Sequence, residues 1–252
     1  MRPQYYYEPP RSNNWLDRLR PLTQPPTAYL IFFAGLILAI FLSVQSNPTI
    51  SRIGPRLLIL LIAFPIHELA HAVVADRLGD STPRRSGRLT LNPLAQLNFL
   101  GSILMIVVGL GWAYVPINPS ALRPNPRTGH MLVAAAGPIA NLILAGVVAL
   151  LWYALLPFIG GFSALENNAF NILSQFAFIN IALFIFNLVP VPPLDGFAIL
   201  KGLLPYSLAY QLERIQPYSF LIFMLLFFLA GRIMSRIIFE PAIAITRLLF
   251  SL

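Results

Sequence analysis

The chain has 252 residues, 57% of them hydrophobic and only 10% charged, and its net charge of +8 comes from 17 basic and 9 acidic side chains. This composition, with a mean hydropathy of +0.73, is typical of a membrane protein. The absence of cysteine excludes disulfides and thiolate metal sites. The arginines lie between apolar runs. This position indicates that they belong to loops and set the orientation of a membrane protein. We therefore expect a lipid bilayer, and no nucleic acid, as a partner.

Residues 1–27 are rich in proline and tyrosine and lack the apolar stretch that a signal peptide requires. They predict a flexible tail, which its four arginines place in the cytoplasm. Residues 28–252 are expected to form one membrane-embedded domain, an all-α polytopic protein with about six transmembrane segments. The apolar runs that predict these segments are 28–44, 57–75, 99–115, 132–158, 169–191 and 218–239.

The distribution of arginine orients these segments. Four arginines lie within 77–98, so the second segment is expected to run from outside to the cytoplasm, whereas 159–168 has no basic residue and is expected outside. The two assignments agree only if 99–115 dips into the membrane and returns on the cytoplasmic side. Irregular backbone at membrane depth is allowed where protein buries it, so we prefer a re-entrant segment to a full crossing. A small β element is expected at 88–91, after the second segment.

The second segment contains the sequence AFPIHELAHAVVAD, residues 63–76. On a helix, His67 and His71 share a face, with Cβ atoms about 5–6 Å apart, so both imidazoles can reach one Zn²⁺. Glu68 then projects beside the metal and can accept a proton from a water bound there. Ionisable groups are costly in an apolar segment unless they are paired or bind a metal. A proton relay or a hydrogen-bonded polar cluster is the alternative.

A catalytic zinc usually has three protein ligands. The extended motif HExxHxxGxxH fails because Val74 and Arg77 occupy its last two fixed positions. Asp76 falls about 140° from the His71 face of a helix. Asp195 ends the run NLVPVPPLDG beside a predicted helix break. A proline-rich run ending in Asp-Gly indicates a turn by itself, but together with HELAH it favours Asp195 as the third ligand.

These two motifs, in this order, resemble those of the site-2 protease family of intramembrane zinc metalloproteases. The similarity extends to LTLNPLAQLNFLGSI, GWAYVPINP and AAAGPIAN, and fits the minimal six-span branch without a PDZ insertion. It implies one Zn²⁺ per chain held by His67, His71 and Asp195, with Glu68 as the catalytic base. It makes Asn187 a candidate donor to the oxyanion. Asn141 would hold substrate backbone or tie helices together.

The resemblance implies hydrolysis of peptide bonds within or near transmembrane segments of protein substrates, as in regulated intramembrane proteolysis. It also implies a multi-pass protein of a prokaryotic cell membrane, with the active site toward the cytoplasm. The alternative is a transporter that uses the same His, Glu and Asp cluster as a proton or metal pathway. Transporters commonly contain inverted repeats, and no internal repeat is visible in this sequence. The oligomeric state is left open.

Overall fold

The computed structural model describes residues 26–45, 53–96, 98–107, 113–229 and 231–250. Its regular structure is helical, and no β-strand occurs within these ranges. The helices are α2 (Pro26–Ser43), α4 (Ile53–Leu58), the π-helix η2 (Ile59–Ala63), α5 (Phe64–Arg77), α6 (Thr82–Arg85), α7 (Pro93–Gln96), α8 (Phe99–Val107), the 3₁₀ turn η3 (Pro119–Ala121), α9 (Pro126–Ile159), α10 (Ser163–Leu188), α11 (Asp195–Leu203), α12 (Tyr206–Glu213), the 3₁₀ turn η4 (Gln216–Tyr218), α13 (Ser219–Leu229) and α14 (Gly231–Leu249).

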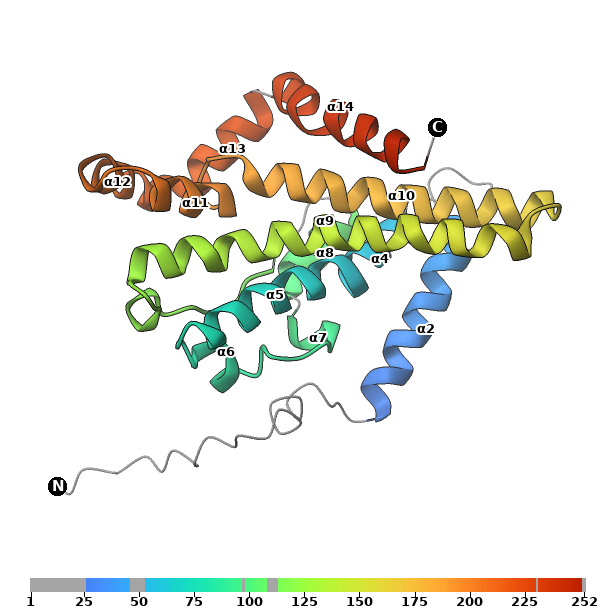
Figure 1. Ribbon diagram of the computed structural model, residues 1–252, viewed down its shortest axis with the longest axis horizontal. Coiled ribbons are helices and arrows are strands. Elements are labelled where there is room, and N and C mark those ends of the chain that lie inside the picture. The colour runs from blue at the N-terminus through green and yellow to red at the C-terminus, as the bar shows by residue number, and fades with distance from the viewer. Residues whose placement is uncertain (1–25, 46–52, 97, 108–112, 230, 251–252) are drawn as a thin grey trace.

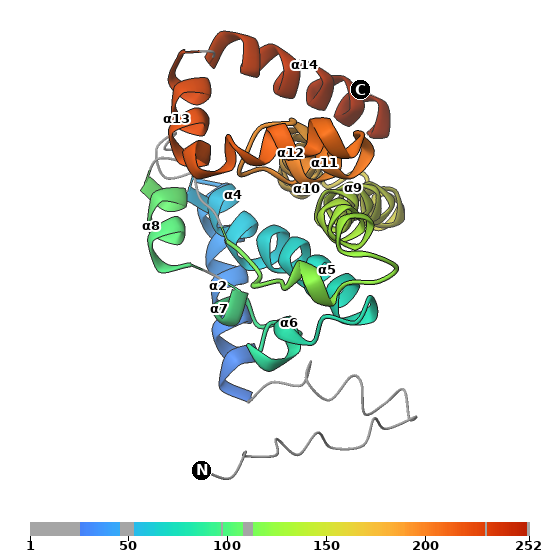
Figure 2. The same cartoon turned by 90° about the vertical axis from the view of Figure 1, so that its left-hand side faces the viewer.

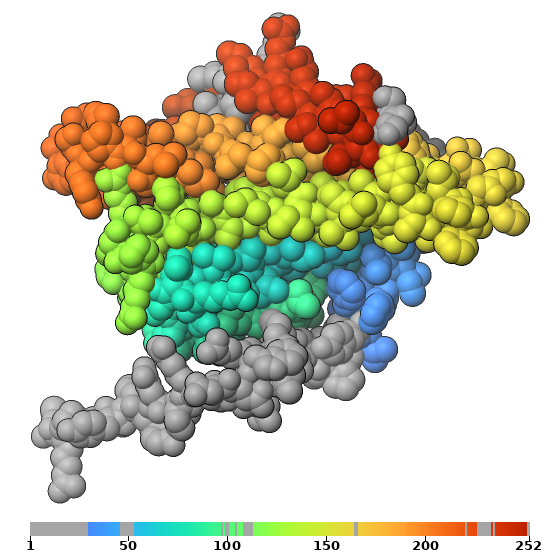
Figure 3. Space-filling view, in the orientation of Figure 1, coloured from blue at the N-terminus to red at the C-terminus, as the bar shows by residue number. Residues whose placement is uncertain are grey.

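Two long antiparallel helices, α9 and α10, form the centre of the molecule and lie side by side (Figure 1). Helix α5 packs against α9 on one side of this pair, and α14 packs against α10 on the other (Figure 2). Helix α11 lies against α9. The space-filling view shows the same layers as successive colour bands, from α5 through α9 and α10 to α14 (Figure 3). A side chain buried between α5, α9 and α11 is therefore enclosed by segments that are far apart in the sequence.

Within the described ranges, three continuous helices are long and apolar enough to cross a membrane: Ile53–Arg77, Pro126–Ile159 and Glu166–Leu188. They contain most of the expected segments 57–75, 132–158 and 169–191, so the membrane character of the protein is confirmed. The loop expected over 159–168 is shorter than predicted, because α9 continues to Ile159 and α10 already begins at Ser163.

The other expected segments are matched by α2, α8, α13 and α14. Helix α2 has 18 residues and corresponds to the expected segment 28–44. Helix α8 covers the first nine residues of the expected segment 99–115, and residues 108–112 of that segment lie outside the described residues. The expected segment 218–239 is divided between α13 and α14. The count of six segments therefore stays a prediction.

Two further expectations are not confirmed. The segment 88–91, where a small β element was expected, has no regular secondary structure, because backbone groups there bond to side chains instead of to a neighbouring strand. The amide of Gln96 donates to the carbonyls of Arg88 and Thr90, at 2.7 and 2.9 Å. The expected tail, 1–27, lies outside the described residues except for its last two positions.

A π-helical turn directly precedes the helix that carries the HELAH motif. Pro65 has no backbone N–H and cannot bond to the carbonyl four residues earlier. The backbone instead takes π geometry over Ile59–Ala63, where the Phe64 N–H bonds to the Ile59 carbonyl. Such π-turns insert one residue into a helix and so rotate the next helical turns about the axis. The π-turn thus sets the face on which the polar residues of α5 lie.

Candidate metal centre

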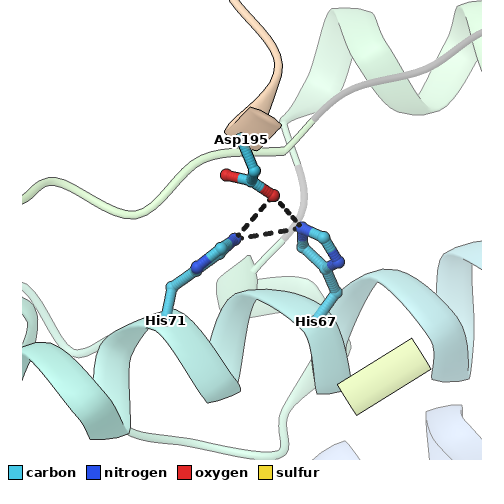
Figure 4. Close-up of side chains that lie close together, drawn as sticks. All are labelled: His67, His71 and Asp195. Carbon is cyan, nitrogen blue, oxygen red and sulfur yellow. Dashed lines mark hydrogen bonds and ion pairs between the residues drawn. The ribbon is translucent and has the colours of Figure 1, made fainter. Parts of the chain in front are cut away.

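Three potential ligand atoms meet between α5 and the start of α11. His67 and His71 project from α5 and Asp195 reaches them from the first residue of α11 (Figure 4). The two Nε2 atoms are 3.0 Å apart, and Asp195 Oδ2 lies 3.2 Å from that of His67 and 3.4 Å from that of His71. This is the one His, Cys, Asp or Glu group of metal-binding geometry within the described part of the chain.

A break between two helices brings Asp195 to this position. Helix α10 ends at Leu188, and the prolines after it cannot continue its hydrogen bonds. The chain turns and α11 begins at Asp195 itself. Gly196 makes the tight turn possible, since a Cβ there would meet the Leu188 carbonyl and lie 2.6 Å from the Val189 oxygen. The carboxylate is thereby directed back toward α5.

Helix α9 forms the wall behind the two imidazoles. Gly137 faces them, and a Cβ on this residue would contact His71 Nε2 and would lie 2.6 Å from His67 Cε1. A hydrogen at this position lets the backbone of α9 approach the histidine rings. Helices α5 and α9 therefore approach closely at Gly137.

The second nitrogen of each ring is held by α9. His71 Nδ1 lies 2.7 Å from the Val133 carbonyl oxygen, and His67 Nδ1 lies 2.6 Å from Oδ1 of Asn141. A carbonyl oxygen can only accept, so each Nδ1 carries the proton and donates it. In neutral imidazole the Nε2 atom then has a free lone pair. Outer hydrogen bonds of this kind orient histidine ligands in metal sites.

The arrangement fits a bound cation. Two nitrogen lone pairs and a carboxylate oxygen converge within 3.4 Å of one another, which is repulsive unless a positive charge lies between them. Asp195 Oδ2 is also buried and has no hydrogen-bond partner among the described residues. Ligands at roughly 2.0–2.1 Å from a tetrahedral Zn²⁺ are about 3.3 Å apart. The observed spacings therefore suit zinc, with a fourth position left for water or substrate.

Three other residues that the sequence analysis considered, Glu68, Asn187 and Asp76, lie outside the group of three ligand atoms. Glu68 is buried, with 6% of its surface exposed, next to His67 on α5. The Asn187 amide donates to the Leu183 carbonyl of its own helix, at 3.0 Å, and makes no hydrogen bond to the three ligand residues within the described structure. Asp76, which helical geometry excluded as a ligand, forms a two-point ion pair with Arg84 at the end of α5.

Sequence reasoning missed two groups that support the histidines. The Val133 carbonyl left no sequence signal, since every residue has one. Asn180 accepts a hydrogen bond from Asn141 at 3.1 Å and is fully buried. A polar residue in an apolar segment was a usable signal for Asn180, because such residues in membranes are uncommon and usually have partners.

The fold and this group of side chains define a membrane protein in which His67, His71 and Asp195 could hold a metal ion. The profile of Peptidase family M50 matches residues 55–160 and 156–230, so the chain belongs to this family, that of the site-2 proteases.

YwhC of Bacillus subtilis, which bears the name of a zinc metalloprotease, is 41% identical over 67% of this chain and 77% of its own length. Rip2 of Mycolicibacterium smegmatis, named in the same way, is 28% identical over 82% of this chain and 83% of its own. The zinc metalloprotease MJ0392 of Methanocaldococcus jannaschii is 23% identical over 74% of this chain and 44% of its own. No solved structure matches the chain significantly. The protein is accordingly a zinc metalloprotease, and Zn²⁺ is its cofactor.

Proposed function

We propose that this zinc metalloprotease cleaves peptide bonds within or near the transmembrane segments of other membrane proteins, as a step of regulated intramembrane proteolysis. The observation that carries the proposal is the position of the ligand group. His67 and His71 project from Ile53–Arg77 and contact Pro126–Ile159, two helices that are apolar enough to lie in a bilayer, and Asp195 reaches the histidines there. A peptide bond must enter the same layer to reach them.

In this proposal the three ligands hold Zn²⁺, which supplies a Lewis acid for the scissile carbonyl and lowers the pKa of water to about 7. A carboxylate oxygen of Glu68 takes the proton from the attacking water and returns it to the leaving amine. Burial of Glu68 keeps this proton away from bulk solvent. The Asn187 amide has a second N–H besides the one given to Leu183, and it would donate to the developing oxyanion.

The substrate must present extended backbone, because a helix uses its own amides for internal hydrogen bonds. Residues 189–194 and 88–91 are non-helical. In the first segment the N–H groups of Val189, Val191 and Leu194 already donate within the chain, and in the second the Arg88 and Thr90 carbonyls accept from Gln96. We propose that an unwound stretch of substrate bonds to the remaining backbone groups of one of these segments by β-addition. Substrates with helix-destabilising sequences near the site are then preferred.

The proposed topology is based on the arginine distribution. The tail 1–27 and the segment 77–98 lie in the cytoplasm, so the metal centre lies toward the cytoplasmic side of a prokaryotic cell membrane. Six segments are proposed, with 99–115 re-entrant.

Replacing Glu68 by glutamine tests the proposal. Glu68→Gln removes the proton acceptor while keeping the size of the side chain, so zinc should stay near one per chain. Cleavage of a single-span substrate in detergent or vesicles should fall by about 10²- to 10⁴-fold, the usual share of general acid–base catalysis. Glu166→Gln, in the first turn of α10, is the matched control and should cleave normally. Near-normal cleavage by Glu68→Gln would refute the assigned role, and a zinc-loaded wild type that cleaves only soluble peptides would refute the membrane substrate.

A further inference from the structure

A chain of hydrogen bonds runs from the backbone of α10 to the metal centre. Asn180 Nδ2 donates to the Phe176 carbonyl at 2.8 Å, and Asn141 Nδ2 donates to Asn180 Oδ1 at 3.1 Å. Asn141 Oδ1 then accepts from His67 Nδ1 at 2.6 Å. The two asparagines, Asn180 and Asn141, are 0% and 1% exposed, so no solvent competes for these bonds. The chain links α10, α9 and α5 through side chains alone.

This series of hydrogen bonds can run in only one donor-to-acceptor direction. An asparagine amide can turn by 180° with little change of shape, so its partners decide which end faces where. The Phe176 carbonyl can only accept, which requires the Asn180 NH₂ to face it. Asn180 Oδ1 must then receive the Asn141 NH₂, and Asn141 Oδ1 is left facing the imidazole. His67 Nδ1 is therefore obliged to donate.

The direction matters because it decides which ring nitrogen is free. If Asn141 were turned, its NH₂ would face Nδ1, and the proton of neutral His67 would move to Nε2, the atom that faces Asp195 and His71. A protonated Nε2 cannot bind a metal. For His71 the backbone carbonyl of Val133 makes the same selection directly. Only His67 depends on side chains for it.

We propose that Asn141 and Asn180 are positioning residues that hold His67 in the Nδ1–H tautomer and so maintain the affinity for zinc. Asn141 thus acts through His67 and does not bind substrate backbone. Asn180 acts from two hydrogen bonds away and touches neither metal nor substrate. The proposal rests on His67 as a zinc ligand, but it does not require a particular substrate.

Two substitutions of Asn180 separate the effect of hydrogen-bond direction from the effect of packing. Asn180→Leu removes the acceptor for the Asn141 NH₂, so Asn141 can turn. Asn180→Asp keeps an acceptor in both its ionised and protonated forms, so the direction is preserved although a carboxyl group is buried. A purely structural role predicts that the buried carboxyl is the more harmful change. The directional role predicts the opposite order for zinc affinity. Asn171→Leu, at an exposed position of the same helix, is the control.

Zinc affinity is measured by competition with a chelator in detergent. We expect a loss of roughly tenfold or more for Asn180→Leu, within the 10–100-fold range for outer partners of a metal ligand, and a smaller loss for Asn180→Asp. The metal-free protein gives a second measurement, because it has only three histidines to label with ¹⁵N. His67, assigned by its loss in His67→Gln, should show one tautomer in the wild type and in Asn180→Asp, and a mixture in Asn180→Leu.

The proposal is overturned if Asn180→Leu keeps the wild-type zinc affinity and a single His67 tautomer, or if Asn180→Asp binds zinc more weakly than Asn180→Leu. Neither measurement uses proteolysis. Failure of the proposed membrane substrate would leave both results intact, and failure of the tautomer experiment would leave cleavage by the wild type unaffected.

Discussion

Replacing Gly137 with alanine should weaken zinc binding without unfolding the protein. The added methyl group would contact His71 Nε2 and lie 2.5 Å from His71 Cε1 and 2.6 Å from His67 Cε1. Carbon atoms normally approach to about 3.5–4.0 Å. The methyl group is therefore about 1 Å too close to both rings, which must turn or move with α5.

The size of the effect depends on the displacement that zinc tolerates. Metal–ligand distances vary by only about 0.2 Å, so rings displaced by about 1 Å cannot keep their bonds. Without zinc each ring is held only by its hydrogen bond to α9 and can shift with it, so the strain falls mainly on the zinc-bound state, which adds a second constraint to each ring. Overpacking of one methyl group costs about 1–3 kcal/mol, which corresponds to a loss of affinity of roughly 5- to 150-fold.

The assay is zinc affinity by chelator competition, with thermal unfolding measured in parallel. Gly146→Ala on the same helix is the matched control, because a Cβ at that position meets nothing within 4 Å. The control should bind zinc normally and gain about 0.5–1 kcal/mol of stability, the usual preference of a helix for alanine over glycine. Wild-type affinity in Gly137→Ala, or an equal loss in both variants, would show that the close approach of α9 does not limit the site.

Asp195→Ala should leave zinc with two histidines and reduce its affinity by more than about 100-fold, beyond the usual cost of losing an outer hydrogen-bond partner. Asp76→Asn should leave metal content unchanged, since that residue pairs with Arg84, and the reverse result would refute the choice of ligand. A topology reporter inserted after Val115 should read cytoplasmic, as a re-entrant 99–115 requires, whereas an external reading would mean a complete crossing.

The sequence by itself determined the local features of this protein. The apolar runs identified the long helices because length and hydropathy suffice to span a bilayer. The interval of four residues placed His67 and His71 on one face of α5, since 3.6 residues make a helical turn. The prolines before Asp195 indicated a helix break beside the site, because a missing N–H acts locally.

Tertiary packing decided the rest, because contacts across helices leave no periodic signal. The expected β element at 88–91 was a local inference, and side-chain hydrogen bonds from Gln96 occupy its backbone instead. Asn141 meets His67 across 74 positions and Asn180 across 39, and only the packing of α9 between α5 and α10 brings them together. Spacing could place two candidate ligands, His67 and His71, on one helix. The approach of Asp195 to these histidines and the hydrogen bonds that orient His67 depend on how separate helices pack, which the small size of Gly137 and Gly196 permits.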